Sequence, residues 1–223
     1  MMILADDEKS LEGPSSRQIR ELPFASCYVY SPSDARAASR LLCVSIKTGH
    51  MKALVDRAIQ ADQACRSLSL ATFFPAAAIL VPVPGSSPSA WGRATPSGRL
   101  AIALREHGFG NGIWFGLRRV RAVRKSATAA RGARPSLRAH FDTIAVDPIH
   151  LPQASHFVLI DDVVTKGRTL LAAAQRLSVI FPQADIRGFA LLRTMGYSPV
   201  FDQLLMPCTG KIKWACDDAR RIP

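Results

Sequence analysis

The segment from Phe157 to Leu170, FVLIDDVVTKGRTL, constrains the fold more than any other part of the 223-residue chain. Its first four residues are apolar, and a short continuous apolar run predicts a buried strand of a parallel sheet. Asp161 and Asp162 follow directly. The strand therefore delivers two carboxylates to its carboxyl end, which is where open α/β sheets bind ligands.

The turn after the two aspartates has the composition of an anion site. It leads into a helix predicted over 169–181 and ended by Pro182. Such a turn aims backbone N–H groups and a helix N-terminus at one point. Gly167 permits close approach of the backbone, and Thr165 and Thr169 add hydroxyl donors. Carboxylates beside this cradle suit a ligand with a phosphate and either vicinal hydroxyls or a bound metal ion.

Two other classes of protein also end an apolar strand in acidic residues. A nucleoside triphosphatase would carry G-x-x-x-x-G-K-[ST], but Gly210-Lys211 is followed by Ile212 and lacks the upstream glycine. A phospho-acceptor receiver domain has no need of TKGRT directly after the pair. An anion-binding loop is therefore the favoured interpretation.

Apolar runs and helical stripes alternate along the rest of the chain. Strands are predicted at 78–81, 113–115, 141–146, 157–160, 186–192 and 212–214, and helices at 31–44, from about 50, at 97–107 and at 169–181. This alternation predicts an α/β fold with a parallel sheet of about five strands flanked by helices. We divide the chain into a flexible tail (1–25), a helical N-terminal segment (26–75) and a core (76–223). The N-terminal segment and the chain end are expected to form a small hood.

The composition predicts a substantial core and no membrane span. Hydrophobic residues make up 48% of the chain and charged residues 21%, which excludes a disordered chain. The longest nearly uncharged run, 70–84, contains three prolines and is shorter than the ~18 residues of a span. Asp6, Asp7 and Glu8 stand where a signal peptide is basic. A cytoplasmic location is therefore expected.

Cysteine and histidine spacing indicates no metal motif. The five cysteines are scattered and form no CxxC pair, so they are interpreted as buried thiols. His107, His140, His150 and His156 also lack ligand spacing. They are interpreted as structural or surface residues.

The net charge of +12 is concentrated in one stretch. Between Glu106 and Asp142 there is no acidic residue. The cations of this stretch are Arg118, Arg119, Arg121, Arg124, Lys125, Arg131, Arg134 and Arg138. They predict contact with a polyanion, either a phosphorylated small molecule or a nucleic acid, and a solvated basic surface is the remaining alternative.

The segment 157–170 resembles the phosphoribosyl pyrophosphate (PRPP) signature of type I phosphoribosyltransferases. That signature is an apolar strand, two acidic residues and a T-x-G-x-T-like loop. The resemblance implies that Asp161 and Asp162 hold the ribose hydroxyls and Mg²⁺. It assigns the 5′-phosphate to Val164, Thr165, Lys166, Gly167, Arg168 and Thr169.

More of the chain, roughly residues 27–195, is similar to the ComF-like branch of this family. The similar features are Tyr30 and Pro32 before a helix, Ile46-Lys47, Val81-Pro82-Val83-Pro84, and the arginine-rich stretch from Leu117 to Phe141. Three features of the branch are absent. The chain has no N-terminal zinc module, carries Trp91-Gly92-Arg93-Ala94-Thr95 in place of the usual Arg-Gly-aromatic-Asn run, and has no glutamine near Lys125.

The resemblance also implies further site residues. It assigns pyrophosphate to Val83, Pro84, Gly85, Ser86 and Arg121, and catalytic roles to Asp161, Asp162, Arg118, Arg119 and Lys125. The expected activity is Mg²⁺-dependent transfer of ribose-5-phosphate from PRPP to an unknown acceptor, with release of pyrophosphate. The alternative is a non-catalytic sensor or scaffold that binds nucleic acid or a nucleoprotein through the arginine-rich stretch. A homodimer is left open.

Overall fold

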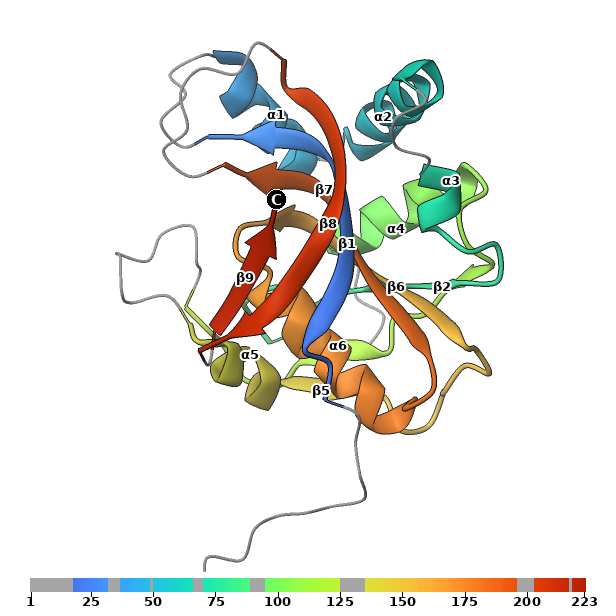
Figure 1. Cartoon of the computed structure of the whole chain (residues 1–223), viewed down its shortest axis with the longest axis vertical. Coiled ribbons are helices and arrows are strands. Elements are labelled where there is room, and N and C mark those ends of the chain that lie inside the picture. Colours follow the sequence, from blue (N-terminus) through green and yellow to red (C-terminus); the bar gives the residue numbers. More distant parts are fainter. Residues whose placement is uncertain are drawn as a thin grey trace, which may run out of the picture.

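A mixed sheet forms the centre of the protein (Figure 1). The computed structural model describes residues 18–31, 37–48, 50–65, 70–88, 95–124, 135–195, 203–216 and 218–223. The strands of the main sheet are β1 (Glu21–Tyr30), β2 (Ile79–Pro82), β3 (Gly112–Ile113), β6 (His156–Val164), β7 (Asp185–Thr194), β8 (Leu205–Ala215) and β9 (Asp218–Ile222). The helices are α1 (Ala37–Thr48), α2 (Met51–Cys65), α3 (Leu70–Phe73), α4 (Pro96–Glu106), α5 (Leu137–Thr143) and α6 (Arg168–Ile180). A separate two-stranded sheet pairs β4 (Leu117–Arg119) with β5 (Ile144–Val146).

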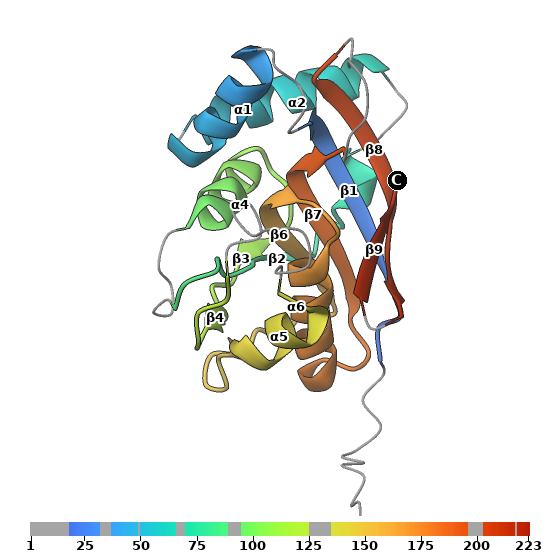
Figure 2. The same ribbon diagram turned by 90° about the vertical axis from the view of Figure 1, so that its left-hand side faces the viewer.

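The main sheet has the strand order β3-β2-β6-β7-β1-β8-β9. From β3 to β1 all neighbours are parallel, which confirms the α/β class with a mostly parallel sheet. The predicted strands included residues 212–214, which are the end of the longer β8, but omitted β1 and β9. β8 pairs antiparallel with β1 and β9 pairs antiparallel with β8, so both extend the β1 edge (Figure 2). These two strands are antiparallel because a connection as short as 216–217 joins only antiparallel neighbours.

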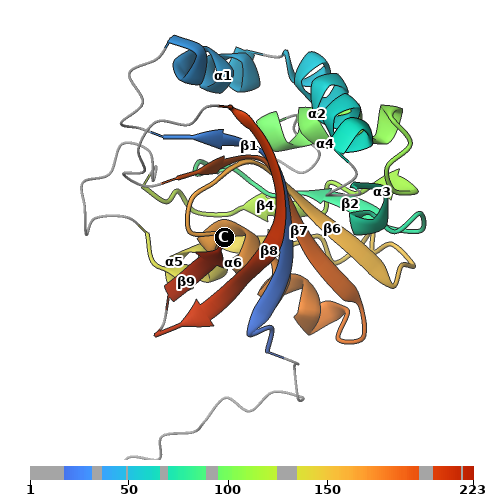
Figure 3. The same cartoon turned by 45° about the horizontal axis from the view of Figure 1, so that its top comes forward.

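Helices cover both faces of the sheet (Figure 3). On one face α1, α2 and α4 enclose a core in which Leu104 and Val158 are buried. On the other face α5 and α6 enclose a core with Leu159 and Leu170. Val158 and Leu159 are consecutive because side chains alternate along a strand, and a strand buried on both faces therefore reads as a continuous apolar run. Within the described parts of the chain, every helix falls short of the length and apolar content needed to cross a membrane.

The connections between strands place a crevice between β2 and β6. The chain leaves β2 through α4 toward β3, and it leaves β6 through α6 toward β7. These crossovers run in opposite directions along the sheet and lie on opposite faces. Where the crossovers of two neighbouring parallel strands run in opposite directions, a binding crevice forms at the carboxyl ends of those strands.

The expected tail boundary at residue 25 differs from the structure. β1 begins at Glu21, and its residues Leu22 and Phe24 are fully buried. Pro23 interrupts the local strand pattern, whereas pairing of β1 with both β7 and β8 stabilises the strand. The N-terminal segment 26–75 therefore contributes the second half of β1 to the main sheet as well as helices.

The strand predicted at 141–146 is wrong in its first half. Residues 141–143 form the last turn of α5, and β5 begins at Ile144. Ser136 caps α5, because its hydroxyl accepts a hydrogen bond from the Ala139 N–H at 3.1 Å. The apolar run was thus divided between a capped helix and a short strand.

Candidate anion-binding site

The carboxyl ends of β2 and β6 separate at Asp161. The two strands pair in register up to Pro82 and Ile160, and the Val83 N–H donates to the Ile160 carbonyl at 2.9 Å. Beyond this bond β6 continues beside β7 alone, as far as Val164. Asp161 is therefore the first residue beyond the part of β6 that pairs with β2.

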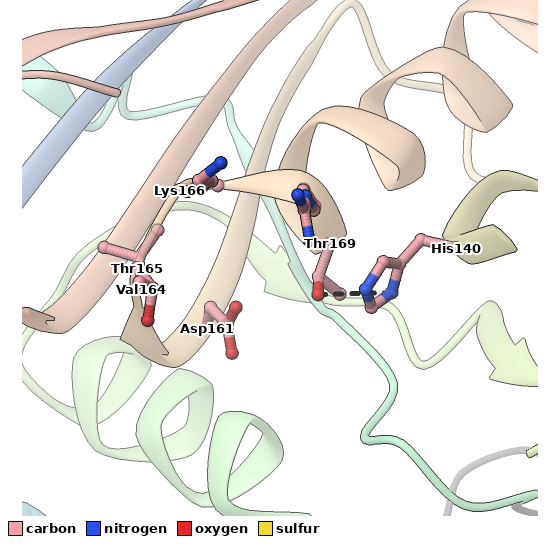
Figure 4. A pocket seen from close by; sticks show the side chains of 8 residues that line it. His140, Asp161, Val164, Thr165, Lys166 and Thr169 are labelled. Carbon is pink, nitrogen blue, oxygen red and sulfur yellow. Dashed lines mark hydrogen bonds between the residues drawn. The ribbon is translucent and has the colours of Figure 1, made fainter. Parts of the chain in front are cut away.

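A pocket lies between this end of β6 and the start of α6 (Figure 4). It is lined by His140, Asp161, Val164, Thr165, Lys166, Gly167, Arg168 and Thr169. The structure thus brings all six predicted loop residues together with Asp161. The pocket volume is about 60 Å³, whereas one water molecule requires about 10–15 Å³. A phosphate-sized group fits, and a larger ligand has to extend along the sheet edge.

Gly167 shapes the loop through its backbone. Its φ is +87°, in the left-handed region that favours glycine. A Cβ at this position would lie 2.6 Å from Cδ1 of Ile212, a fully buried residue of β8. Gly167 is also the N-cap of α6 and supplies no side-chain cap, so the first N–H groups of this helix are available to an anion.

The Asp161 and Asp162 carboxyl groups lie close together. Both residues are half-buried, and the Asp162 N–H donates to Oδ1 of Asp161 at 3.0 Å. Removal from water raises the pKa of Asp161 well above its usual value, and the neighbouring charge of Asp162 raises it further. Ionisation of both carboxyl groups is therefore disfavoured unless a cation or a hydroxyl donor stabilises the negative charge.

The charged groups of the two loop cations, Lys166 and Arg168, bond to the C-terminal strand, although both residues also line the pocket. Asp218 of β9 accepts from Lys166 Nζ at 2.8 Å and is bound by Arg168 through Nε and Nη2. Figure 4 shows Lys166 directed away from Asp161. The hydrogen bond from Arg168, assisted by that from Lys166, holds the pKa of Asp218 well below its usual value. Both loop cations thus share one carboxylate, and the three groups together keep one net positive charge.

Replacing Asp218 by asparagine is expected to lower the free energy of unfolding by about 1–3 kcal/mol at pH 7, because two cations lose a charged acceptor. The pKa of Asp218 is lowered on folding, so its stabilisation is present above the unfolded value and is lost as the pH falls. The difference from wild type, measured by urea unfolding, should shrink below about pH 4. Asp142→Asn is the control, because Asp142 pairs with the exposed Arg138. This substitution should lower the free energy of unfolding by less than about 1 kcal/mol. Equal losses in the two variants would contradict this prediction.

The turn predicted to hold pyrophosphate follows β2 directly. Val83 and Pro84 are buried, Gly85 is exposed and Ser86 is half-buried. The Gly85 carbonyl accepts a hydrogen bond from Nε of Arg119 at 2.9 Å. Arg119 thus connects this turn with β4.

Arg119 is a buried cation, with 1% of its surface exposed. Burial lowers the pKa of Arg119 to about 10, and the nearby charge of Asp161 opposes this shift. The guanidinium therefore keeps its charge at neutral pH. Arg118, its neighbour on β4, is half-buried.

The other predicted cations lie apart from the pocket or outside the described residues. Lys125 lies outside the described residues. Arg121 is exposed and lines, with Arg124, a second cavity of about 380 Å³. The Val123 N–H donates to the Ser86 carbonyl at 2.8 Å, so this stretch passes beside the turn predicted for pyrophosphate.

Three residues near the loop were not predicted as site residues from the sequence. His140, interpreted as structural or surface, is buried on α5 and lines the pocket. Asp218 holds the loop cations, and Arg221 Nε donates to the Thr165 carbonyl at 3.0 Å. Their spacing carries no signal, because α5 and β9 are brought to the loop only by the tertiary fold.

Comparisons with known proteins leave the family open. No protein-family model matches the chain, and the curated proteins include no significant sequence match. The function is therefore inferred from the chemistry of the pocket. Its lining combines the Asp161 carboxyl group, threonine hydroxyls and the N-terminus of a helix, and Asp162 is the neighbour of Asp161 outside that lining.

Proposed function

We propose that the protein adopts a type I phosphoribosyltransferase-like fold, binds PRPP with Mg²⁺ and transfers its ribose-5-phosphate to an acceptor. The observation that carries the proposal is the phosphate-sized pocket of loop 164–169 beside Asp161 at the carboxyl end of β6. PRPP has a matching arrangement, since its 5′-phosphate and its vicinal ribose hydroxyls belong to one small sugar.

The loop and the aspartates divide the recognition between them. The 5′-phosphate accepts hydrogen bonds from the first N–H groups of α6 and from the hydroxyls of Thr165 and Thr169. The ribose hydroxyls donate to the carboxylates of Asp161 and Asp162. Because Lys166 and Arg168 both bond to Asp218, the direct contacts to the phosphate come chiefly from N–H groups, hydroxyls and the helix dipole.

The donor set also fits Mg²⁺, which prefers oxygen ligands and is usually bound by one or two carboxylates together with substrate phosphates. Asp161 and Asp162 would hold it. The raised pKa of Asp161 results from burial and from a second carboxylate nearby, and a divalent cation reduces this repulsion. When bound, the ion stabilises negative charge on the leaving pyrophosphate.

The proposed reaction is a substitution at C1 of the ribose. A nucleophilic atom of the acceptor forms a bond to C1, the C1–O bond to pyrophosphate breaks, and pyrophosphate leaves with the electron pair. The acceptor loses a proton to water or to a base. The turn at 83–86 and the cations Arg118, Arg121 and Lys125 would stabilise the departing charge, most effectively when water is excluded.

Calorimetric titration of the full chain with PRPP tests the proposal. We expect saturable binding that requires Mg²⁺, weaker binding of ribose 5-phosphate, and no binding of ribose, which lacks the phosphate. A folded protein that binds neither phosphorylated ligand would overturn the proposal. Salt-sensitive binding to random oligonucleotides in that case would favour the alternative, a non-catalytic protein that engages nucleic acid through its arginine-rich stretch.

A further inference from the structure

The buried guanidinium of Arg119 joins α5 to the turn after β2. Beside its bond to Gly85, it donates from Nη1 to the Thr143 hydroxyl at 2.6 Å and to the His140 carbonyl at 3.3 Å. Its Nη2 lies 3.3 Å from Nδ1 of His140. A guanidinium carries donors and no acceptor, so each of these partners has to accept.

This requirement determines the form of the His140 ring. Nδ1 accepts from Arg119 only when it is unprotonated, and the ring proton then resides on Nε2. The surroundings favour this neutral form. Burial lowers the pKa of His140 to about 4, and the charges of Arg119 on β4 and Arg168 on α6 contribute. Asp161 on β6, which faces Arg119, is the nearby negative charge.

The same nitrogen also faces the phosphate pocket. Nδ1 of His140 lies 3.5 Å from Oγ1 of Thr169, in the first turn of α6 (Figure 4). Thr169 lines the pocket. One atom of His140 thus lies between the loop that borders the pocket and the arginine that holds the turn after β2.

We propose that His140 is a positioning residue that, through Arg119, holds the pyrophosphate turn at 83–86 in register with the phosphate loop at 164–169. The inference rests on the proposed function, because it concerns a ligand that spans both segments. PRPP reaches the loop with its 5′-phosphate and the turn with its pyrophosphate. Ribose 5-phosphate reaches the loop alone.

This difference between the two ligands supplies the test. In His140→Ala, Nη2 of Arg119 loses its acceptor and the link through the imidazole ring to Thr169 is lost, while the bonds of Arg119 to Gly85, Thr143 and the backbone of residue 140 remain. We expect PRPP with Mg²⁺ to bind about 10- to 100-fold more weakly, the effect of losing a hydrogen bond to a charged group. Ribose 5-phosphate should weaken far less than PRPP, since it does not reach the turn at 83–86 and the N–H groups of α6 are unchanged.

Two further variants distinguish a positioning role of His140 from a general disruption of the fold. His140→Asn keeps a side-chain acceptor near the place of Nδ1 and should restore most of the PRPP affinity. His150→Ala removes an exposed histidine that pairs with Asp147 and should bind both ligands as wild type does. The three variants and the wild type are compared by calorimetry, after circular dichroism has established that each is folded.

A second readout needs no ligand. In ¹⁵N-labelled wild-type protein, the ring-nitrogen shifts of His140 should report the neutral Nε2–H form at pH 5.5, where a free histidine is protonated. A protonated His140 at that pH would overturn the inference. Equal weakening of PRPP and ribose 5-phosphate in His140→Ala, or no weakening of either, would also overturn it while leaving the proposed function intact. A wild-type protein that binds neither ligand would overturn both.

Discussion

Replacing Asp161 and Asp162 together by asparagine is expected to abolish Mg²⁺-dependent binding of PRPP and any turnover that depends on it. The substitutions remove both carboxylates that accept from the ribose hydroxyls and that would ligate the metal ion, while side-chain volume hardly changes. We expect at least a 100-fold loss of affinity, since several charge-assisted contacts are lost at once. Calorimetry with PRPP and Mg²⁺ measures the affinity, and pyrophosphate release measures turnover once an acceptor is known. Unchanged binding would contradict the assigned site.

The same variant should be more stable than wild type at neutral pH in the absence of ligand. The pKa of Asp161 is raised on folding, so its contribution to stability is present below the unfolded value and is lost as the pH rises through the raised pKa. Asparagine does not ionise and avoids this loss. Thermal unfolding between pH 4 and pH 8 should therefore show a growing advantage of the variant toward high pH. A variant that loses both stability and binding at pH 7 would indicate a structural role for the pair instead.

Replacing Gly167 by alanine is expected to destabilise the fold and to disrupt the phosphate loop. Alanine in the left-handed region costs about 1–2 kcal/mol, and the collision of its Cβ with Ile212 adds about 1–3 kcal/mol of overpacking. A total of about 2–5 kcal/mol should appear in urea unfolding. Ribose 5-phosphate should bind at least tenfold more weakly, because relief of the collision moves the start of α6.

Gly108 provides a matched control for the backbone alone. Its φ of +84° is close to that of Gly167, but a Cβ at Gly108 meets no atom within 4 Å. Gly108→Ala should therefore cost only the conformational part, about 1–2 kcal/mol. Ile212→Val in the Gly167→Ala background should recover part of the difference by removing the Cδ1 methyl. If Gly167→Ala and Gly108→Ala lose the same free energy of unfolding, then close packing of the loop on β8 does not contribute to the destabilisation of Gly167→Ala.

The residues of loop 164–169 were predictable because they are consecutive in the chain. An apolar strand, two aspartates, a glycine-containing turn and an amphipathic helix each follow from local composition. A parallel strand brings such a segment to a sheet edge whatever lies around it. For the same reason β2, β6, β7, α4 and α6 were located from their apolar patterns, and the α/β class followed from their alternation.

Elements whose form depends on distant partners were predicted less well. The first half of β1 begins with the charged Glu21, is broken by Pro23, and is stabilised by pairing with β7 and β8. The run from Phe141 to Val146 is divided between α5 and β5 by the cap at Ser136 and by pairing with β4. In both cases tertiary contacts outweigh a weak local preference.

The amino-acid sequence alone thus determined the class of the fold, the strand that carries Asp161 and Asp162, and the loop that follows them, because all of these depend on neighbours in the chain. Only the tertiary structure decided which of the charged side chains already bond to partners within the protein. Asp218 binds both Lys166 and Arg168, and Arg119 is buried against Gly85 and His140. These partners lie more than 20 residues apart in the chain, and the direction of a charged side chain is set by the nearest opposite charge or acceptor in space.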